Sequence, residues 1–184
     1  MHPPIHLALS WLAGHKLEAR RDRRLVAWAG VVPDLDALSL LGGVAAYSQY
    51  HHVLTHGLVA ALVTAGLWTA FARQKWKVLA LSLLAFHLHL LCDLVGSGVE
   101  GEHWSITYLY PFSRKETLFT WGWDLSSPEN AFVWLGAVAA TLLIALRRSR
   151  SFGETFLTAR ADGAVVEVLR KLLGRASAPG PGAS

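Results

Sequence analysis

The chain of 184 residues has one cysteine, Cys92, and few charges, since only 16% of its residues are Asp, Glu, Lys or Arg. A single cysteine excludes an internal disulfide and leaves the redox compartment open. The N-terminus lacks the positively charged start and small-residue cleavage site of a secretory signal, so we expect residues 1–16 to remain as a helix. With 53% hydrophobic residues, the composition indicates one compact unit embedded in lipid, with no room for a second large domain.

Three long apolar segments predict spanning helices, at residues 53–72, 78–95 and 128–146. Each is near the ~20 residues that cross a bilayer. Ser127 as N-cap, followed by Pro128 and Glu129, favours the start of the third. Two shorter runs, 5–15 and 25–32, predict a half-depth helical hairpin packed on the spans. Residues 37–50, interrupted by Gly42-Gly43, predict a short helix and a connector.

The C-terminal part differs in character. Residues 152–174 mix apolar side chains with Arg160, Arg170 and Lys171, which predicts an amphipathic helix on the membrane surface. Residues 176–184 are rich in Ala, Pro and Gly, and we expect them to be disordered. The predicted fold is therefore an all-α polytopic membrane bundle: a membrane-embedded domain over 1–150, a cytoplasmic amphipathic helix over 151–175 and a tail over 176–184.

Basic residues form three clusters, which lie within 16–24, 73–77 and 147–150. If the predicted spans alternate in direction, the second and third clusters fall on one side, which the positive-inside rule makes cytoplasmic. Residues 96–127 then face outward. Because the bases flank apolar spans, we do not expect nucleic acid as a partner. The expected partner is the lipid bilayer.

Histidines and carboxylates lie inside or beside these apolar stretches, where ionisable groups are costly. His89 and Asp93 share a helical face because they are four residues apart. If the first two spans are antiparallel, His56 and Asp93 reach a similar depth, and Asp34 and Asp36, on the loop after Pro33, can reach the same level. Imidazole and carboxylate ligands suit zinc, manganese or iron, so the pattern indicates a divalent metal.

Two alternatives stay open for these residues. An ordinary Pro-Asp turn would account for Asp34 and Asp36 if they stood alone. Helical periodicity pairs His52, rather than His51, with His56.

The order of these motifs resembles the predicted membrane-bound metal-dependent hydrolases of bacterial inner membranes, over residues 4–146. The matching residues are His6, Asp34 with Asp36, His51 with Thr55 and His56, His89 with Asp93, and Pro111-Phe112-Ser113. The chain departs from the family in having His52 and Val53 where the family has Arg and Gly, and Gly57 where it has Ser. The family register favours His51 as a ligand, with His52 as the alternative.

This resemblance implies a multi-pass inner-membrane hydrolase that binds one or two divalent ions, with zinc expected. The implied ligands are His6, Asp34, Asp36, His51, His56, His89 and Asp93. Asp34 or Asp36, where not needed as a ligand, would be the catalytic base. Arg114 and Lys115 could attract the anionic head of an amphiphilic ester or phosphoester substrate, such as a lipid.

Two other classes of function fit the same residues. A non-enzymatic membrane protein could use them as a structural metal site or as a metal or proton carrier. A scaffold could instead recruit a partner through its basic C-terminal helix.

Overall fold

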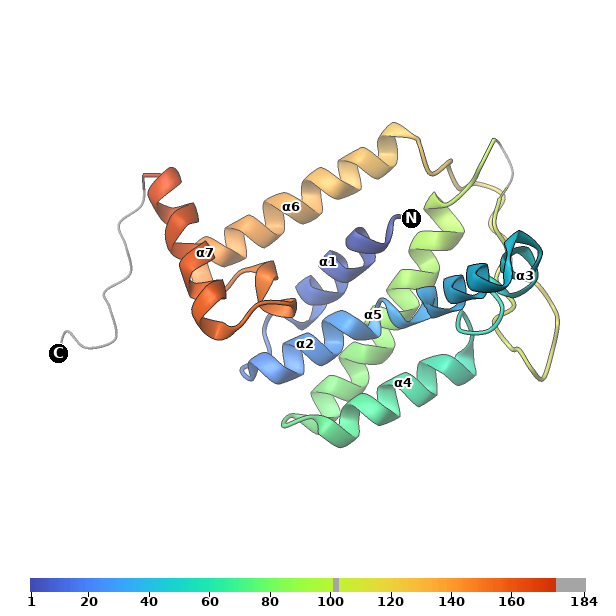
Figure 1. Cartoon of the computed structure of the whole chain (residues 1–184), viewed down its shortest axis with the longest axis horizontal. Coiled ribbons are helices and arrows are strands. Elements are labelled where there is room, and N and C mark those ends of the chain that lie inside the picture. Colours follow the sequence, from blue (N-terminus) through green and yellow to red (C-terminus); the bar gives the residue numbers. More distant parts are fainter. Residues whose placement is uncertain (101–102, 175–184) are drawn as a thin grey trace.

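A computed structural model describes residues 1–100 and 103–174, and Figure 1 shows their arrangement. The described residues contain helices and two isolated β-bridges but no strand, which confirms the all-α prediction. In chain order the elements are α1 Pro3–Gly14, α2 Arg20–Ala29, the 3₁₀ helix η1 Val32–Gly42, α3 Val44–Tyr50, α4 Leu58–Phe71, α5 Lys75–Gly96, α6 Pro128–Arg148, the 3₁₀ helix η2 Phe152–Thr155 and α7 Ala159–Leu172.

Within residues 1–100 and 103–174, two helices are long and apolar enough to cross a membrane, α5 with 22 residues and α6 with 21. The predicted span over 53–72 is too long, because residues 51–57 leave the helical path and α4 keeps only 14 residues, about 21 Å at ~1.5 Å per residue. A third span can come from another part of the chain, because α2 and η1 together are long and apolar enough to cross a membrane, with a bend of 51° between them.

The predicted N-terminal hairpin is present as α1 and α2, which pack against each other and against α5. Most residues of the first basic cluster, those at 20–24, form the start of α2, where arginine is a good helix former. The carboxylate of Asp22 accepts the backbone N–H groups of Arg73 and Gln74, at 2.9 and 2.8 Å. This contact ties the start of α2 to the turn between α4 and α5.

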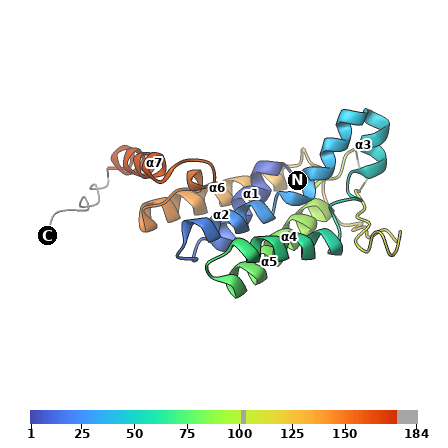
Figure 2. The same ribbon diagram turned by 60° about the horizontal axis from the view of Figure 1, so that its bottom comes forward.

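All three basic clusters lie at one end of the molecule. The Asp22 contact joins the first two, and Arg150 donates to the carbonyl of Leu17 in the α1–α2 turn. Figures 1 and 2 show α7 at one end and α3 at the other. Under the positive-inside rule the end with α7 is cytoplasmic. The histidines and carboxylates predicted to bind metal lie towards the opposite end, with α3 (Figure 1).

The C-terminal segment is divided into η2 and α7, where the sequence predicted one continuous amphipathic helix. Thr158 caps α7 by accepting from the N–H of Ala161. Glu154, in η2, is buried and binds the guanidinium of Arg23 through two hydrogen bonds of 2.6 Å. It also accepts from the indole N–H of Trp11 at 2.8 Å. The predicted tail, 176–184, lies outside the described residues.

The start of α6 is held differently from the prediction. Ser127 occupies the N-cap position, but its side chain makes no capping hydrogen bond. Instead the amide of Asn130 donates to the carbonyls of Gly96 and Leu125, at 3.0 and 2.9 Å. This side chain joins the end of α5 to the loop that precedes α6.

Candidate metal centre

Four side chains from three parts of the chain converge in the half of the bundle near α3. Asp34 comes from η1, His56 from the loop before α4, and His89 and Asp93 from α5. One ligand atom from each lies within 4.8 Å of the others. The Nε2 atom of His89 is 2.8 Å from Asp93 Oδ2, 3.4 Å from His56 Nε2 and 3.6 Å from Asp34 Oδ1. This arrangement could hold a metal ion.

Local sequence explains how these residues meet. The four-residue spacing of His89 and Asp93 sets them one turn apart on the same face of α5. Asp34 lies just after the bend between α2 and η1, where Pro33 occupies an early position of η1. Gly57, next to His56, lets the loop between α5 and α6 approach closely, because a Cβ at Gly57 would lie 2.8 Å from the carbonyl oxygen of Tyr108.

The far side of each imidazole is occupied, which orients the near side. His89 Nδ1 lies 2.8 Å from the carbonyl oxygen of Gly30, and because a carbonyl only accepts, Nδ1 must carry the proton. His56 Nδ1 lies 2.8 Å from Asp36 Oδ2. In the neutral rings both Nε2 atoms therefore direct lone pairs into the cluster, the arrangement found in metal-bound histidines.

One cation already lies beside the cluster, because the N-terminal amino group of Met1 donates to Asp93 Oδ1 at 2.5 Å. Asp34 Oδ2 and Asp93 Oδ2 are buried and have no hydrogen-bond partner among the described residues. The side chains of His56 and His89 are fully buried and that of Asp93 is 3% exposed. Burial lowers the pKa of His56, but its hydrogen bond to Asp36 and the negative charges of Asp36 and Asp93 raise it to about 9. Buried carboxylate oxygens that accept no hydrogen bond are costly, so a cation next to Asp34 and Asp93 would relieve this arrangement.

Asp36 and His51 lie one contact outside the cluster. Asp36 binds His51 Nδ1 through Oδ1 at 2.7 Å and His56 Nδ1 through Oδ2. Its backbone N–H donates to the hydroxyl of Thr55 at 3.1 Å. Both carboxylate oxygens are thus engaged, and Asp36 fixes the orientation of His56.

His6 and His52 flank the cluster without joining it. The ring of His6 stacks on that of His89 with centroids 3.8 Å apart, and its Nε2 lies 3.2 Å from Asp93 Oδ1. His52 is buried with a positive φ of 64°. The periodicity argument for His52 does not apply, since residues 51–57 are not helical. Burial and the charge of His56 lower the pKa of His52 to about 3.

One cavity gives access to the cluster. It has a volume of about 330 Å³, and Asp34 and Asp93 line it together with Tyr47, His52 and Trp104. Asp34 has the most exposed side chain of the cluster, at 20%. A small group entering this cavity would meet Asp34 first.

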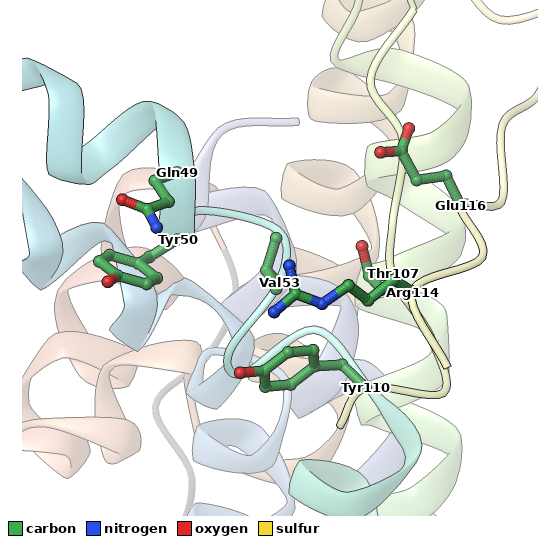
Figure 3. Close-up of a pocket in the computed structure, with 7 residues that line it drawn as sticks. All are labelled: Gln49, Tyr50, Val53, Thr107, Tyr110, Arg114 and Glu116. Atoms are coloured by element: carbon green, nitrogen blue, oxygen red, sulfur yellow. The ribbon is translucent and has the colours of Figure 1, made fainter. Parts of the chain in front are cut away.

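Arg114 lies in a different cavity of about 220 Å³, shown in Figure 3, where its guanidinium lies among Tyr50, Val53 and Tyr110. The two cavities have no lining residue in common. Lys115 lines neither of them. The predicted substrate-binding pair is therefore not brought to the cavity that contains the cluster.

Sequence reasoning missed Gly30, whose carbonyl orients His89. No sequence pattern marks a backbone acceptor on a neighbouring helix. The position needs glycine for a separate reason, because a Cβ there would overlap the hydroxyl of Ser10. A glycine at the end of an apolar helix was the one available signal.

A family model described as YdjM inner membrane protein matches residues 1–164. No curated protein and no solved structure matches the chain significantly. The family match confirms the predicted inner-membrane location. Its description names no enzymatic activity, so the hydrolase part of the prediction stays a prediction.

Proposed function

We propose that this chain, which belongs to the YdjM inner membrane protein family, is a metal-dependent hydrolase. His56, His89 and Asp93 would bind one divalent ion, with zinc expected, and Asp34 would lie beside it. One observation supports the proposal. The Nε2 atoms of His56 and His89 converge with two carboxylates, each of which has one buried oxygen that accepts no hydrogen bond, while both Nδ1 atoms bind other groups.

The residues divide into two roles. His56, His89 and Asp93 are the buried members and would hold the ion, which when bound acidifies a water molecule and polarises a carbonyl or phosphoryl oxygen. Asp34 reaches the cavity and keeps an unpaired oxygen, so it would take the proton from water. Asp36 is not suited to that role because both its oxygens bind histidines.

The cavity supports an amphiphilic substrate. Its walls include the aromatic rings of Tyr47 and Trp104, and its floor holds carboxylates and imidazoles. It lies at one end of the membrane helices, where a lipid-like ester or phosphoester would present its polar part. We therefore propose an ester or phosphoester at the membrane interface as the substrate class.

The bend of 51° between α2 and η1 favours a metal carrier as a second candidate. Transporters often place ion sites at such breaks in membrane helices. Against a carrier, two aromatic rings are fully buried: Trp11 towards the basic end of α1, and Phe86 at the middle of α5, one turn from His89. These rings would have to move before an ion could pass.

Metal analysis of the full chain, purified in neutral detergent, tests the proposal. We expect about one zinc per chain in the wild type, loss of metal in Asp93→Asn, and retained metal in His87→Gln. His87 is a matched control, because it is on the same helix but binds the hydroxyl of Tyr108 at 2.8 Å. Wild-type protein that binds no divalent metal would end the proposal.

Activity is tested with chromogenic phosphodiesters and short-chain esters in mixed micelles. We expect Asp34→Asn to keep its metal and to lose roughly 100-fold or more in kcat, as for a general base. Metal uptake into liposomes without hydrolysis would favour the carrier instead. Full turnover by Asp93→Asn would contradict metal-dependent catalysis.

A further inference from the structure

A third cavity lies at the basic end, away from the cluster. It has a volume of about 490 Å³ and lies between α2 and α4, lined by Arg20, Arg21, Arg24, Leu25, Trp28 and Trp68. It shares no lining residue with the cavity at the metal centre. The proposed reaction uses none of the residues that line it.

Two of the three arginines have no acidic partner among the described residues. Arg20 donates to the carbonyls of Glu154 and Leu157 and lies 4.0 Å from the Glu154 carboxylate. Arg21 lies over the ring of Phe71, 5.9 Å from its centroid. No ion pair in the described part of the chain involves Arg21 or Arg24, so the cavity has an excess of positive charge.

The one carboxylate within this stretch does not neutralise them. Asp22 is fully buried, and its two oxygens accept the backbone N–H groups of Arg73 and Gln74. Glu154 is likewise committed to Arg23 and Trp11. The exposed guanidinium groups of Arg21 and Arg24 are therefore free to bind an anion from outside the chain.

The other half of the cavity is apolar. Arg24 and Trp28 are four residues apart on α2, so charge at the helix start gives way to an indole one turn deeper. Trp68 contributes a buried Nε1–H with no acceptor among the described residues. Next to it on α4, Leu67 and Phe71 are 53% and 55% exposed. An occupant with one anionic end and one hydrocarbon end would satisfy all of these groups.

We propose that this cavity binds an anionic phospholipid of the cytoplasmic leaflet. Its phosphate would contact Arg21 and Arg24, the Trp68 indole would donate to a phosphate or ester oxygen, and an acyl chain would lie along α4. Basic pockets between membrane helices on the cytoplasmic side bind anionic head groups. The proposal is independent of the hydrolase function.

Native mass spectrometry of the full chain in neutral detergent micelles tests it, with phosphatidylglycerol or phosphatidylcholine of matched acyl chains as the probe. We expect the wild type to prefer phosphatidylglycerol. The double variant Arg21→Gln/Arg24→Gln should lose roughly 30-fold in affinity for it, since each arginine contributes about a fivefold attraction. The matched control Arg147→Gln/Arg148→Gln removes equal charge from the end of α6, outside the cavity, and should change affinity less than about threefold.

Equal losses in the two double variants would overturn the proposal, because attraction would then be general. Equal binding of the two lipids would overturn it as well. Displacement of phosphatidylglycerol by excess inorganic phosphate would show a phosphate site instead. If the arginine variant does not fold, quenching of Trp fluorescence by brominated phosphatidylglycerol decides the matter: Trp68→Phe must lose part of the quenchable signal, and an unchanged quenchable fraction would refute the site.

Discussion

Asp36 should control the zinc affinity of the metal centre without being a ligand. Its hydrogen bond to His56 Nδ1 is 2.8 Å long, and both side chains are fully buried. Replacing Asp36 by Leu leaves that N–H unpaired, at a cost of about 1–3 kcal/mol. The ring can avoid this cost by moving its proton to Nε2, the atom that faces the cluster, and there the proton competes with the metal.

We therefore expect Asp36→Leu to raise the Kd for zinc by about 10–100-fold, the usual effect of losing an outer hydrogen-bond partner. Asp36→Asn should lose less than about tenfold, since its amide oxygen can still accept from His56. The assay is competition between the purified chain and a chromophoric zinc chelator in neutral detergent. Circular dichroism of the same samples verifies that each variant is folded.

His51 provides the decisive comparison. It contacts Asp36 Oδ1 and lies outside the cluster, so His51→Ala should change the Kd by less than about threefold, whereas Asp36→Leu changes it far more. The family register instead makes His51 a ligand, which requires His51→Ala to be as damaging as His56→Ala. That result, or an unchanged affinity in Asp36→Leu, would refute the reasoning from hydrogen bonds.

Three further predictions concern the fold. Glu154→Ala should lower the free energy of unfolding by about 3–5 kcal/mol, since it leaves Arg23 buried and unpaired; denaturant titration in micelles measures this, and a loss under about 1 kcal/mol would contradict it. Asn130→Ala should speed amide hydrogen exchange in residues 122–127, because its amide anchors that loop to α5; unchanged exchange would show that the anchor is dispensable. Burial lowers the pKa of His56, but the neighbouring carboxylates raise that pKa from 6.5 to about 9. Protonation of His56 therefore stabilises the chelator-treated protein fully below pH 6.5, and this stability is lost as the pH rises through 9. A melting temperature that does not change over this range would contradict the assigned hydrogen bonds.

The sequence alone determined most of the architecture, because lipid restricts a chain to a few solutions. A membrane helix must satisfy its own backbone, so long apolar runs predicted α5 and α6 closely. Proline and paired glycines predicted the breaks around η1 and α3. The same reasoning from apolar runs extended the predicted span at 53–72 into residues 53–57, whereas α4 begins only at Leu58. Composition could not show that this stretch leaves the helix and brings His56 next to Asp36.

The tertiary structure decided how the ionisable residues divide their roles. Sequence spacing grouped five histidines and aspartates, and the family resemblance added His6 and His51. All seven were equivalent candidates, since residue type states only what an atom can donate or accept. Packing sets the direction in which each side chain points. Gly30 fixes the ring of His89 and Asp36 fixes the ring of His56. Both rings then face the same point as the carboxylates of Asp34 and Asp93. The charge pattern 20–24 was visible in the sequence, but only the packing of α2 on α4 turned it into a cavity with indole walls. Local composition thus determined the elements, and contacts between residues distant in sequence determined what each polar group faces.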